Sequence, residues 1–186
     1  MLLYYALFVL PMIALVSVVG YLPWAWAGRR EKKSLLCHLT RYALIGCALS
    51  LLYLTILWYY PDITFRPEYY FLNLRPFVWL TEVYEMGARR MVEQLVTNVV
   101  MFVPWGFLLP AAMPKLRRWL PALGTVLATT VGIETVQFFI GRSADIDDVI
   151  MNFLGGALGY GLYRLLNRAL ADRPWWQHLL GTPLNK

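Results

Sequence analysis

Residues 120–166 read LPALGTVLATTVGIETVQFFIGRSADIDDVIMNFLGGALGYGLYRLL, and this stretch decides the fold class. Two apolar runs, Leu120–Ile140 and Ile146–Leu166, are joined by the short segment Gly141–Asp145. Each run has about the ~20 residues that a helix needs to cross a bilayer. The short connection predicts two antiparallel neighbouring helices whose joined ends lie on the same side of the membrane.

The rest of the chain contains three more runs of this kind, Leu3–Trp24, Tyr42–Pro61 and Gln94–Pro114. Of the 186 residues, 59% are hydrophobic and 15% charged, whereas soluble domains have about 45–50% and 25%. This composition excludes a soluble globular domain and a disordered chain. We expect one all-α domain over residues 1–186, with about five transmembrane helices.

The longest connection, residues 61–94, lies between the second and third predicted spans. It contains the aromatic stretch Tyr69–Phe71, which suits a membrane interface. Its second half repeats with helical period and predicts one extracytoplasmic interfacial helix that leads into the third span. The apolar positions of this helix are Leu80, Val83, Tyr84, Gly87, Met91 and Leu95.

The distribution of Lys and Arg predicts the orientation in the plasma membrane. With five spans, twelve of the seventeen basic residues fall on the side that holds the C-terminus and five on the other side. Because basic loops stay in the cytoplasm, we expect the N-terminus outside and the C-terminus inside. The net charge of +6 is therefore no sign of nucleic-acid binding. Cys37 and Cys47 are expected to be free thiols.

Polar residues interrupt the last two spans in a regular pattern. Thr130, Glu134 and Gln137 share one helix face. A charged side chain such as Glu134 in the bilayer interior costs about 2.5–3.5 kcal/mol on insertion scales. The last span has a matching stripe. Its members are Asp145, Asp148, Asn152, Gly155 and Gly159.

Small residues at every fourth position suggest how the two stripes meet. Gly124, Ala128 and Gly132 in the fourth span, with Gly155 and Gly159 in the fifth, predict close packing of these two helices. Arg142 in the turn and Asn98 at the start of the third span lie on the same side as the acids. The stripes form either a functional cavity or a structural polar lock between helices.

These residues also carry a family resemblance. Residues 98–106, NVVMFVPWG, resemble the N-x-x-x-F-x-P-x-G motif of the VanZ-like membrane proteins, and residues 73–77, NLRPF, resemble its N-x-x-P-F element. Residues 134–155 resemble the signature E-x-x-Q…R…D-x-D-D-x-x-x-N-x-x-G. The resemblance covers about residues 70–165. It implies a small multi-span protein and brings in the family's association with resistance to the glycopeptide teicoplanin.

The first functional hypothesis is a non-enzymatic protein of the cell envelope with a pocket on the outer side. Its partners would be membrane lipids and a polar head group, a cell-wall precursor or a glycopeptide-related ligand, with Arg75 and Arg142 suited to phosphate. The oligomeric state stays open. The candidate ligand-binding residues are Asn73, Arg75, Asn98, Glu134, Gln137, Arg142, Asp145, Asp147, Asp148 and Asn152.

Two alternatives remain. The first is a metal-assisted membrane enzyme for a lipid-linked phosphate substrate, in which Glu134, Asp145 and Asp148 hold a divalent cation such as Mg²⁺. Glu134, Asp147 and Asp148 would then be catalytic, although neither His38 nor His178 falls near them in the sequence. The second is a transporter subunit, in which Pro104 and Pro110 break the third span into half-helices.

Overall fold

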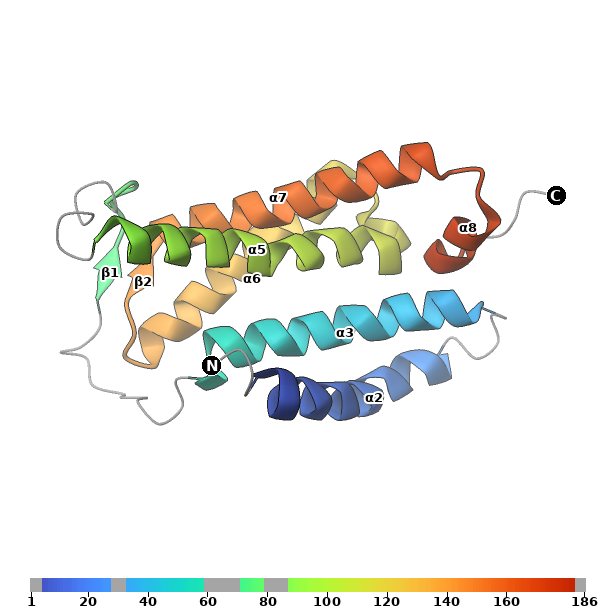
Figure 1. Ribbon diagram of the computed structural model, residues 1–186, viewed down its shortest axis with the longest axis horizontal. Coiled ribbons are helices and arrows are strands. Elements are labelled where there is room, and N and C mark those ends of the chain that lie inside the picture. The colour runs from blue at the N-terminus through green and yellow to red at the C-terminus, as the bar shows by residue number, and fades with distance from the viewer. Residues whose placement is uncertain (1–4, 28–32, 59–70, 79–86, 183–186) are drawn as a thin grey trace.

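The computed structural model describes residues 5–27, 33–58, 71–78 and 87–182, and these residues form an all-α bundle (Figure 1). Five of its helices are long and apolar enough to cross a membrane. A π-helical turn, η1 (Tyr5–Val9), precedes the first of them. The five long helices are α2 (Leu10–Ala27), α3 (Leu35–Thr55), α5 (Ala88–Ala112), α6 (Trp119–Phe139) and α7 (Ile146–Ala169).

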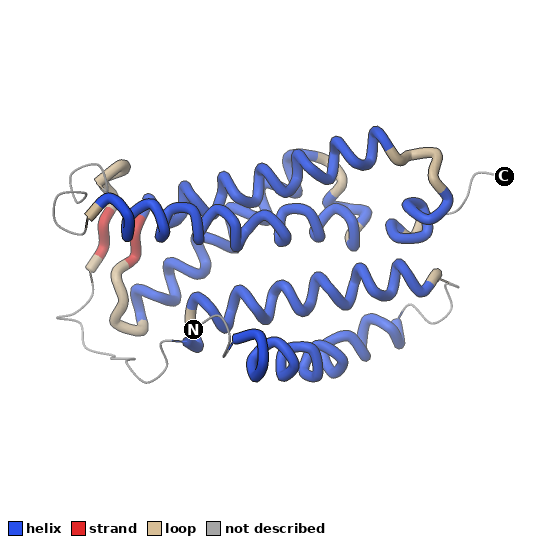
Figure 2. The backbone as a smooth tube through the Cα atoms, viewed as in Figure 1, coloured by secondary structure: helices blue, strands red, loops and turns tan. Residues whose placement is uncertain are grey.

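The five long helices run roughly lengthwise, with α2 and α3 on one side of the bundle and α5, α6 and α7 on the other (Figure 1). The described connections lie at the two ends (Figure 2). One end carries the short strands β1 (Leu72–Asn73) and β2 (Ala144–Asp145), and we call it the strand end. The opposite end carries the 3₁₀ turn η4 (Pro114–Leu116) and the short helix α8 (Pro174–Leu180).

The closest helix packing joins α5 and α7 through glycines. A Cβ atom on Gly159 would lie 2.0 Å from the carbonyl oxygen of Val103, and one on Gly155 would lie 2.1 Å from that of Val99. The predicted role of the GxxxG pair in helix packing is therefore confirmed, but the partner is α5 rather than α6. Small residues bring two backbones together because the bilayer supplies no hydrophobic force between helices.

The prediction that the small residues of α6 form a close packing surface is wrong. A Cβ atom on Gly124 or Gly132 would meet nothing within 4 Å. The helix approaches α7 instead through Val126, whose side chain would lie 2.4 Å from a Cβ atom on Gly156. Because Val126 is fully buried there, bulk rather than close backbone contact fixes the spacing of α6 and α7.

The second predicted span, Tyr42–Pro61, is shifted, since α3 begins at Leu35 and ends at Thr55. Ser34 caps the helix by accepting a 3.2 Å hydrogen bond from the backbone nitrogen of Cys37. Arg41 directly precedes the predicted span, because its charge was taken to indicate a loop. It lies inside α3 instead, with its guanidinium 5.0 Å from the centre of the Trp24 ring. This cation–π contact lets a basic residue lie within the helix.

The third predicted span begins earlier than expected, because α5 extends from Ala88 without a break. The described part of the predicted interfacial helix, from Ala88 onward, is thus the first turns of α5, and residues 79–86 lie outside the described residues. Pro104 and Pro110 both lie inside this continuous helix. The half-helices expected for a transporter are therefore absent from α5.

At the opposite end, α8 packs back onto the bundle. Trp176 is buried against the rings of Tyr163 and Phe107, while Trp175 is about half exposed. Arg117 donates a 2.8 Å hydrogen bond to the carbonyl of Leu180. These contacts close that end, and Cys37 and Cys47 are both free, as expected.

Candidate functional site

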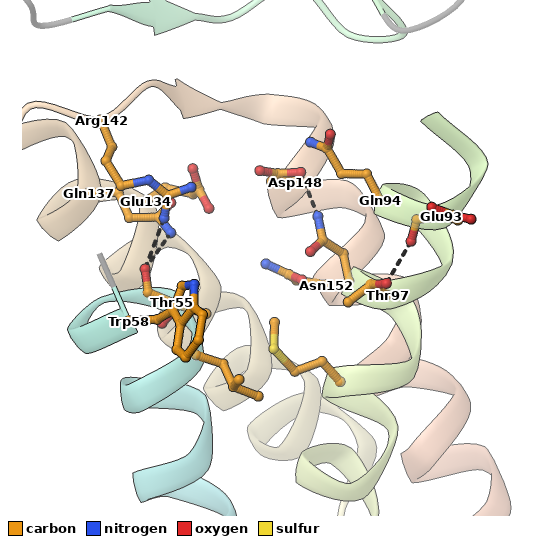
Figure 3. Close-up of a pocket in the computed structure, with 13 residues that line it drawn as sticks. Thr55, Trp58, Glu93, Gln94, Thr97, Glu134, Gln137, Arg142, Asp148 and Asn152 are labelled. Atoms are coloured by element: carbon orange, nitrogen blue, oxygen red, sulfur yellow. Dashed lines mark hydrogen bonds between the residues drawn. The ribbon is translucent and has the colours of Figure 1, made fainter. Parts of the chain in front are cut away.

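A cavity of about 600 Å³ lies at the strand end, between α3, α5, α6 and α7 (Figure 3). Three apolar side chains contribute to its wall, and the other lining residues are polar. Six of them belong to the candidate set from the sequence. These six are Asn98, Glu134, Gln137, Arg142, Asp148 and Asn152.

The polar stripe of α6 turns inward, as its spacing predicts. Thr130, Glu134 and Gln137 are all buried, with 0%, 6% and 5% of their surface exposed. One carboxylate oxygen of Glu134 accepts a 3.0 Å hydrogen bond from the backbone nitrogen of Asp145. This bond connects the cavity wall to the start of α7.

Two side chains hold the end of α3 against α6. The Nε2 atom of Gln137 and the Nη1 atom of Arg142 each donate a 3.0 Å hydrogen bond to the carbonyl oxygen of Thr55 (Figure 3). Thr55 is the last residue of α3, where carbonyl groups lack helical partners and the helix dipole favours a cation. Arg142 therefore closes this side of the cavity.

The α7 wall provides an acid and an amide. Asp148 accepts a 2.5 Å hydrogen bond from Nδ2 of Asn98, so Asn98 reaches the acids that it was predicted to lie beside. Asn152 is only 3% exposed and donates a 3.1 Å hydrogen bond to Oγ1 of Thr130. Its Oδ1 atom has no hydrogen-bond partner within the described part of the chain. Such a buried unpaired acceptor costs about 1–3 kcal/mol.

Other candidate residues lie outside the cavity and hold the chain together. Asp145 is the N-cap of α7 and accepts a 2.8 Å hydrogen bond from the backbone nitrogen of Asp147. Its second oxygen accepts a 3.1 Å hydrogen bond from Nδ2 of Asn73. The two residues are also paired in the parallel ladder of β1 and β2. We call this pair of strands with its side-chain bonds the strand clamp.

Asp147 strengthens the strand clamp from α7. It is 6% exposed and accepts hydrogen bonds of 2.6 Å and 3.0 Å from the backbone nitrogens of Phe77 and Val78. Phe77 has a φ of 64°, a left-handed conformation that is unfavourable for an aromatic residue. Arg75 is exposed in the same segment, and its backbone nitrogen bonds to Oδ1 of Asn73. None of these residues lines the cavity.

The sequence reasoning missed several lining residues. Thr55 is the last residue of α3, Trp58 follows this helix, and Glu93, Gln94 and Thr97 come from α5. A signal for α5 was present, because positions 94, 97, 98 and 101 follow i, i+3, i+4 and i+7 on one helix face. Of the aromatic stretch Tyr69–Phe71, which was predicted to lie at the membrane interface, residues 69 and 70 lie outside the described residues.

The residues present do not fit the predicted metal site. Within the described ranges, no three His, Cys, Asp or Glu side chains are grouped closely enough to hold a metal ion. The carboxylate of Asp145, one of the three predicted ligands, is occupied by the α7 cap and by Asn73. His38 contacts Tyr21, and His178 lies in α8 at the opposite end.

A second hollow lies beside Glu134. It is an apolar groove of about 390 Å³ between the ends of α6 and α7, bordered by β1. Phe138, Val149 and Leu72 are among its lining residues, and Glu134 borders both this groove and the polar cavity. One side chain thus separates a polar space from an apolar one.

Five helices that are long and apolar enough to cross a membrane, with a cavity between four of them, define a multi-pass membrane protein. The chain belongs to the VanZ/LLP1 family, whose profile matches residues 42–167. It is similar to protein VanZ of Enterococcus faecium, with 34% identity over 103 residues, which is 55% of this chain and 58% of that protein. The chain therefore matches little more than half the length of this curated relative. No solved structure matches the chain.

Proposed function

We propose that the protein is a non-enzymatic component of the cell envelope that binds the polar head group of an amphipathic molecule in the cavity. The observation that carries this proposal is the Oδ1 atom of Asn152, which is buried and has no hydrogen-bond partner among the residues that the structure describes. A bound polar group supplies the missing hydrogen-bond donor and removes the cost of the buried acceptor.

The orientation completes the proposal. Among the described residues, the strand end with the cavity carries few basic residues and the α8 end carries more of them. Because basic segments stay in the cytoplasm, the cavity opens toward the outside and the C-terminus lies inside. A ligand then comes from the outer leaflet or from the cell wall, such as a lipid-linked precursor.

The test is retention of a ligand by the protein extracted with its surrounding membrane in polymer nanodiscs. Asn152→Leu removes the amide at similar size, and Asp148→Asn removes one charge. Thr125→Val, whose hydroxyl bonds only within α6, is the control. Mass spectrometry should find one molecule enriched with wild type and control, and reduced about tenfold or more in both cavity variants, as expected for ~1–3 kcal/mol. Equal retention by all folded variants would contradict the proposal.

A contribution to glycopeptide resistance is the second part of this proposal, and it rests on family membership. Expression in a teicoplanin-susceptible host should raise the inhibitory concentration of teicoplanin, and Asp148→Asn should abolish the increase if the cavity is responsible. An increase that is the same for wild type and Asp148→Asn would separate resistance from the cavity. No increase with either protein would remove this part of the proposal.

A further inference from the structure

The cavity wall contains an unpaired hydrogen-bond acceptor. Four of the polar donors in the wall are occupied by neighbouring protein groups, whereas Oδ1 of Asn152 has no hydrogen-bond partner in the described part of the chain. The occupied donors are Thr97 to the carbonyl of Glu93, Asn98 to Asp148, and Gln137 and Arg142 to the carbonyl of Thr55. A ligand therefore completes the hydrogen bonding of the wall when it brings N–H or O–H groups.

The charges point the same way. Glu134 and Asp148 face the cavity from α6 and α7 (Figure 3), and Arg142 is the positive charge that acts on both carboxylates. The guanidinium also serves the end of α3 through Thr55. The cavity wall thus holds the carboxyl groups of Glu134 and Asp148 and one guanidinium. The remaining acid at the cavity, Glu93, has its own partner in Arg89 at 2.9 Å.

We infer that the head group recognised in this cavity carries a protonated primary amine, as in an ethanolamine-type lipid. The inference rests on the proposed function and names the chemistry of its ligand. An ammonium group brings one positive charge and three N–H donors. These match the carboxyl groups of Glu134 and Asp148 and the acceptor atom of Asn152.

Other ligand chemistries fit this wall less well. A phosphate group placed against it would face two carboxylates, and its oxygens would offer no donor to Asn152. A metal ion lacks a group of three ligating side chains among the described residues. An ammonium group needs only hydrogen-bond acceptors, and α6 and α7 both supply acceptors to the wall.

The apolar part of the wall indicates a lipid as the source of the amine. Leu54 and Met101 line the cavity from α3 and α5, both of which are candidate membrane-spanning helices. A head group entering between these helices keeps its glycerol and acyl chains against apolar surface. A free, fully hydrated amine gains nothing from that surface.

The experiment titrates full-length, lipid-stripped protein with three dioleoyl lipids and follows binding by native mass spectrometry. Phosphatidylethanolamine offers N–H donors, phosphatidylcholine has a quaternary ammonium group without N–H, and phosphatidylglycerol has neither. We expect phosphatidylethanolamine to bind about tenfold more tightly than the other two. Asn152→Leu and Glu134→Gln should reduce this preference to about threefold or less, and Thr125→Val should leave it unchanged.

The outcomes separate this inference from the proposed function. Tighter binding of phosphatidylglycerol, lost in Asn152→Leu, would overturn the amine and keep a head-group site. Lipid binding that is unaffected by either cavity variant would overturn both. Free ethanolamine that competes as well as the lipid would keep the amine and overturn the lipid as its source. Thermal unfolding of each variant checks folding, and Glu134→Gln decides the matter if Asn152→Leu is unstable.

Discussion

At the scale of single residues, two adjacent acids have different tasks. Asp147 points to the backbone nitrogens of Phe77 and Val78, whereas Asp148 faces the cavity and accepts from Asn98. Successive residues on a helix point about 100° apart, so one of the pair serves the strand clamp and the other the cavity. Substitution of the two should therefore affect different properties.

Asp147→Asn should destabilise the fold, because an amide offers one acceptor oxygen where two backbone N–H groups need partners. We expect the free energy of unfolding to fall by about 2 kcal/mol, the range for a lost hydrogen bond to a charged group. Thermal or denaturant unfolding in detergent measures the change. Asp148→Asn is the control, since its remaining oxygen still accepts from Asn98. Equal stability of Asp147→Asn and wild type would show that the strand clamp does not depend on this carboxylate.

The sequence identifies the cavity residues of α6 and α7 because helical spacing places Glu134, Gln137, Asp148 and Asn152 on inward faces. Asp147 lies off this stripe, but its residue type alone does not show that it binds backbone nitrogens rather than a ligand. The left-handed backbone conformation of Phe77, whose N–H group binds Asp147, cannot be inferred from the residue type.

At the scale of elements, the packing of α5 on α7 depends on the absence of side-chain atoms at three glycines. A Cβ atom on Gly106 would lie 1.9 Å from the carbonyl oxygen of Gly156, as close as those on Gly155 and Gly159 to α5. These contacts are with backbone atoms, which move only if a whole helix moves. The distance between the two helices is therefore fixed by these positions.

Gly159→Ala should lower the free energy of unfolding by about 1–3 kcal/mol or more, because the added methyl group overlaps the backbone of α5. Gly161→Ala on the same helix is the matched control, since a Cβ atom there would meet nothing within 4 Å. Its stability should stay within about 0.5 kcal/mol of wild type. Equal effects of the two substitutions in detergent unfolding would contradict this packing.

Sequence patterning predicts the number and type of helices but not which faces meet. Both α6 and α7 carry small residues at four-residue spacing, yet only those of α7 contact a neighbouring backbone. The pattern shows that another helix can approach these residues closely, but it does not identify that helix. The shifted start of α3 has a similar cause, because the charge of Arg41 suggests a loop until Trp24 is known to lie beside it.

At the scale of the whole molecule, the ends of the bundle differ in charge and in architecture. The strand end holds the cavity and the clamp, and the other end is closed by α8. With an odd number of long helices, the two ends of the chain lie on opposite sides of a bilayer. The orientation can therefore be tested with one residue at each end.

Ser143→Cys at the strand end should react with a membrane-impermeant maleimide in intact cells. Asp172→Cys, just before α8, should react only after the cells are permeabilised, because the basic end stays in the cytoplasm. Both residues are exposed. The background needs Cys37→Ala and Cys47→Ala to remove the native thiols. The reverse labelling pattern would place the cavity inside the cell and overturn an outer-leaflet ligand.

Glu134 lines both the cavity and the apolar groove, so its side chain borders two spaces at once. We expect shortening it to alanine to widen the connection between these spaces. An acyl chain in the groove could then reach the polar residues of the cavity. Glutamine keeps the size of the side chain and removes the charge, so comparing the two replacements separates the steric role of this position from its electrostatic one.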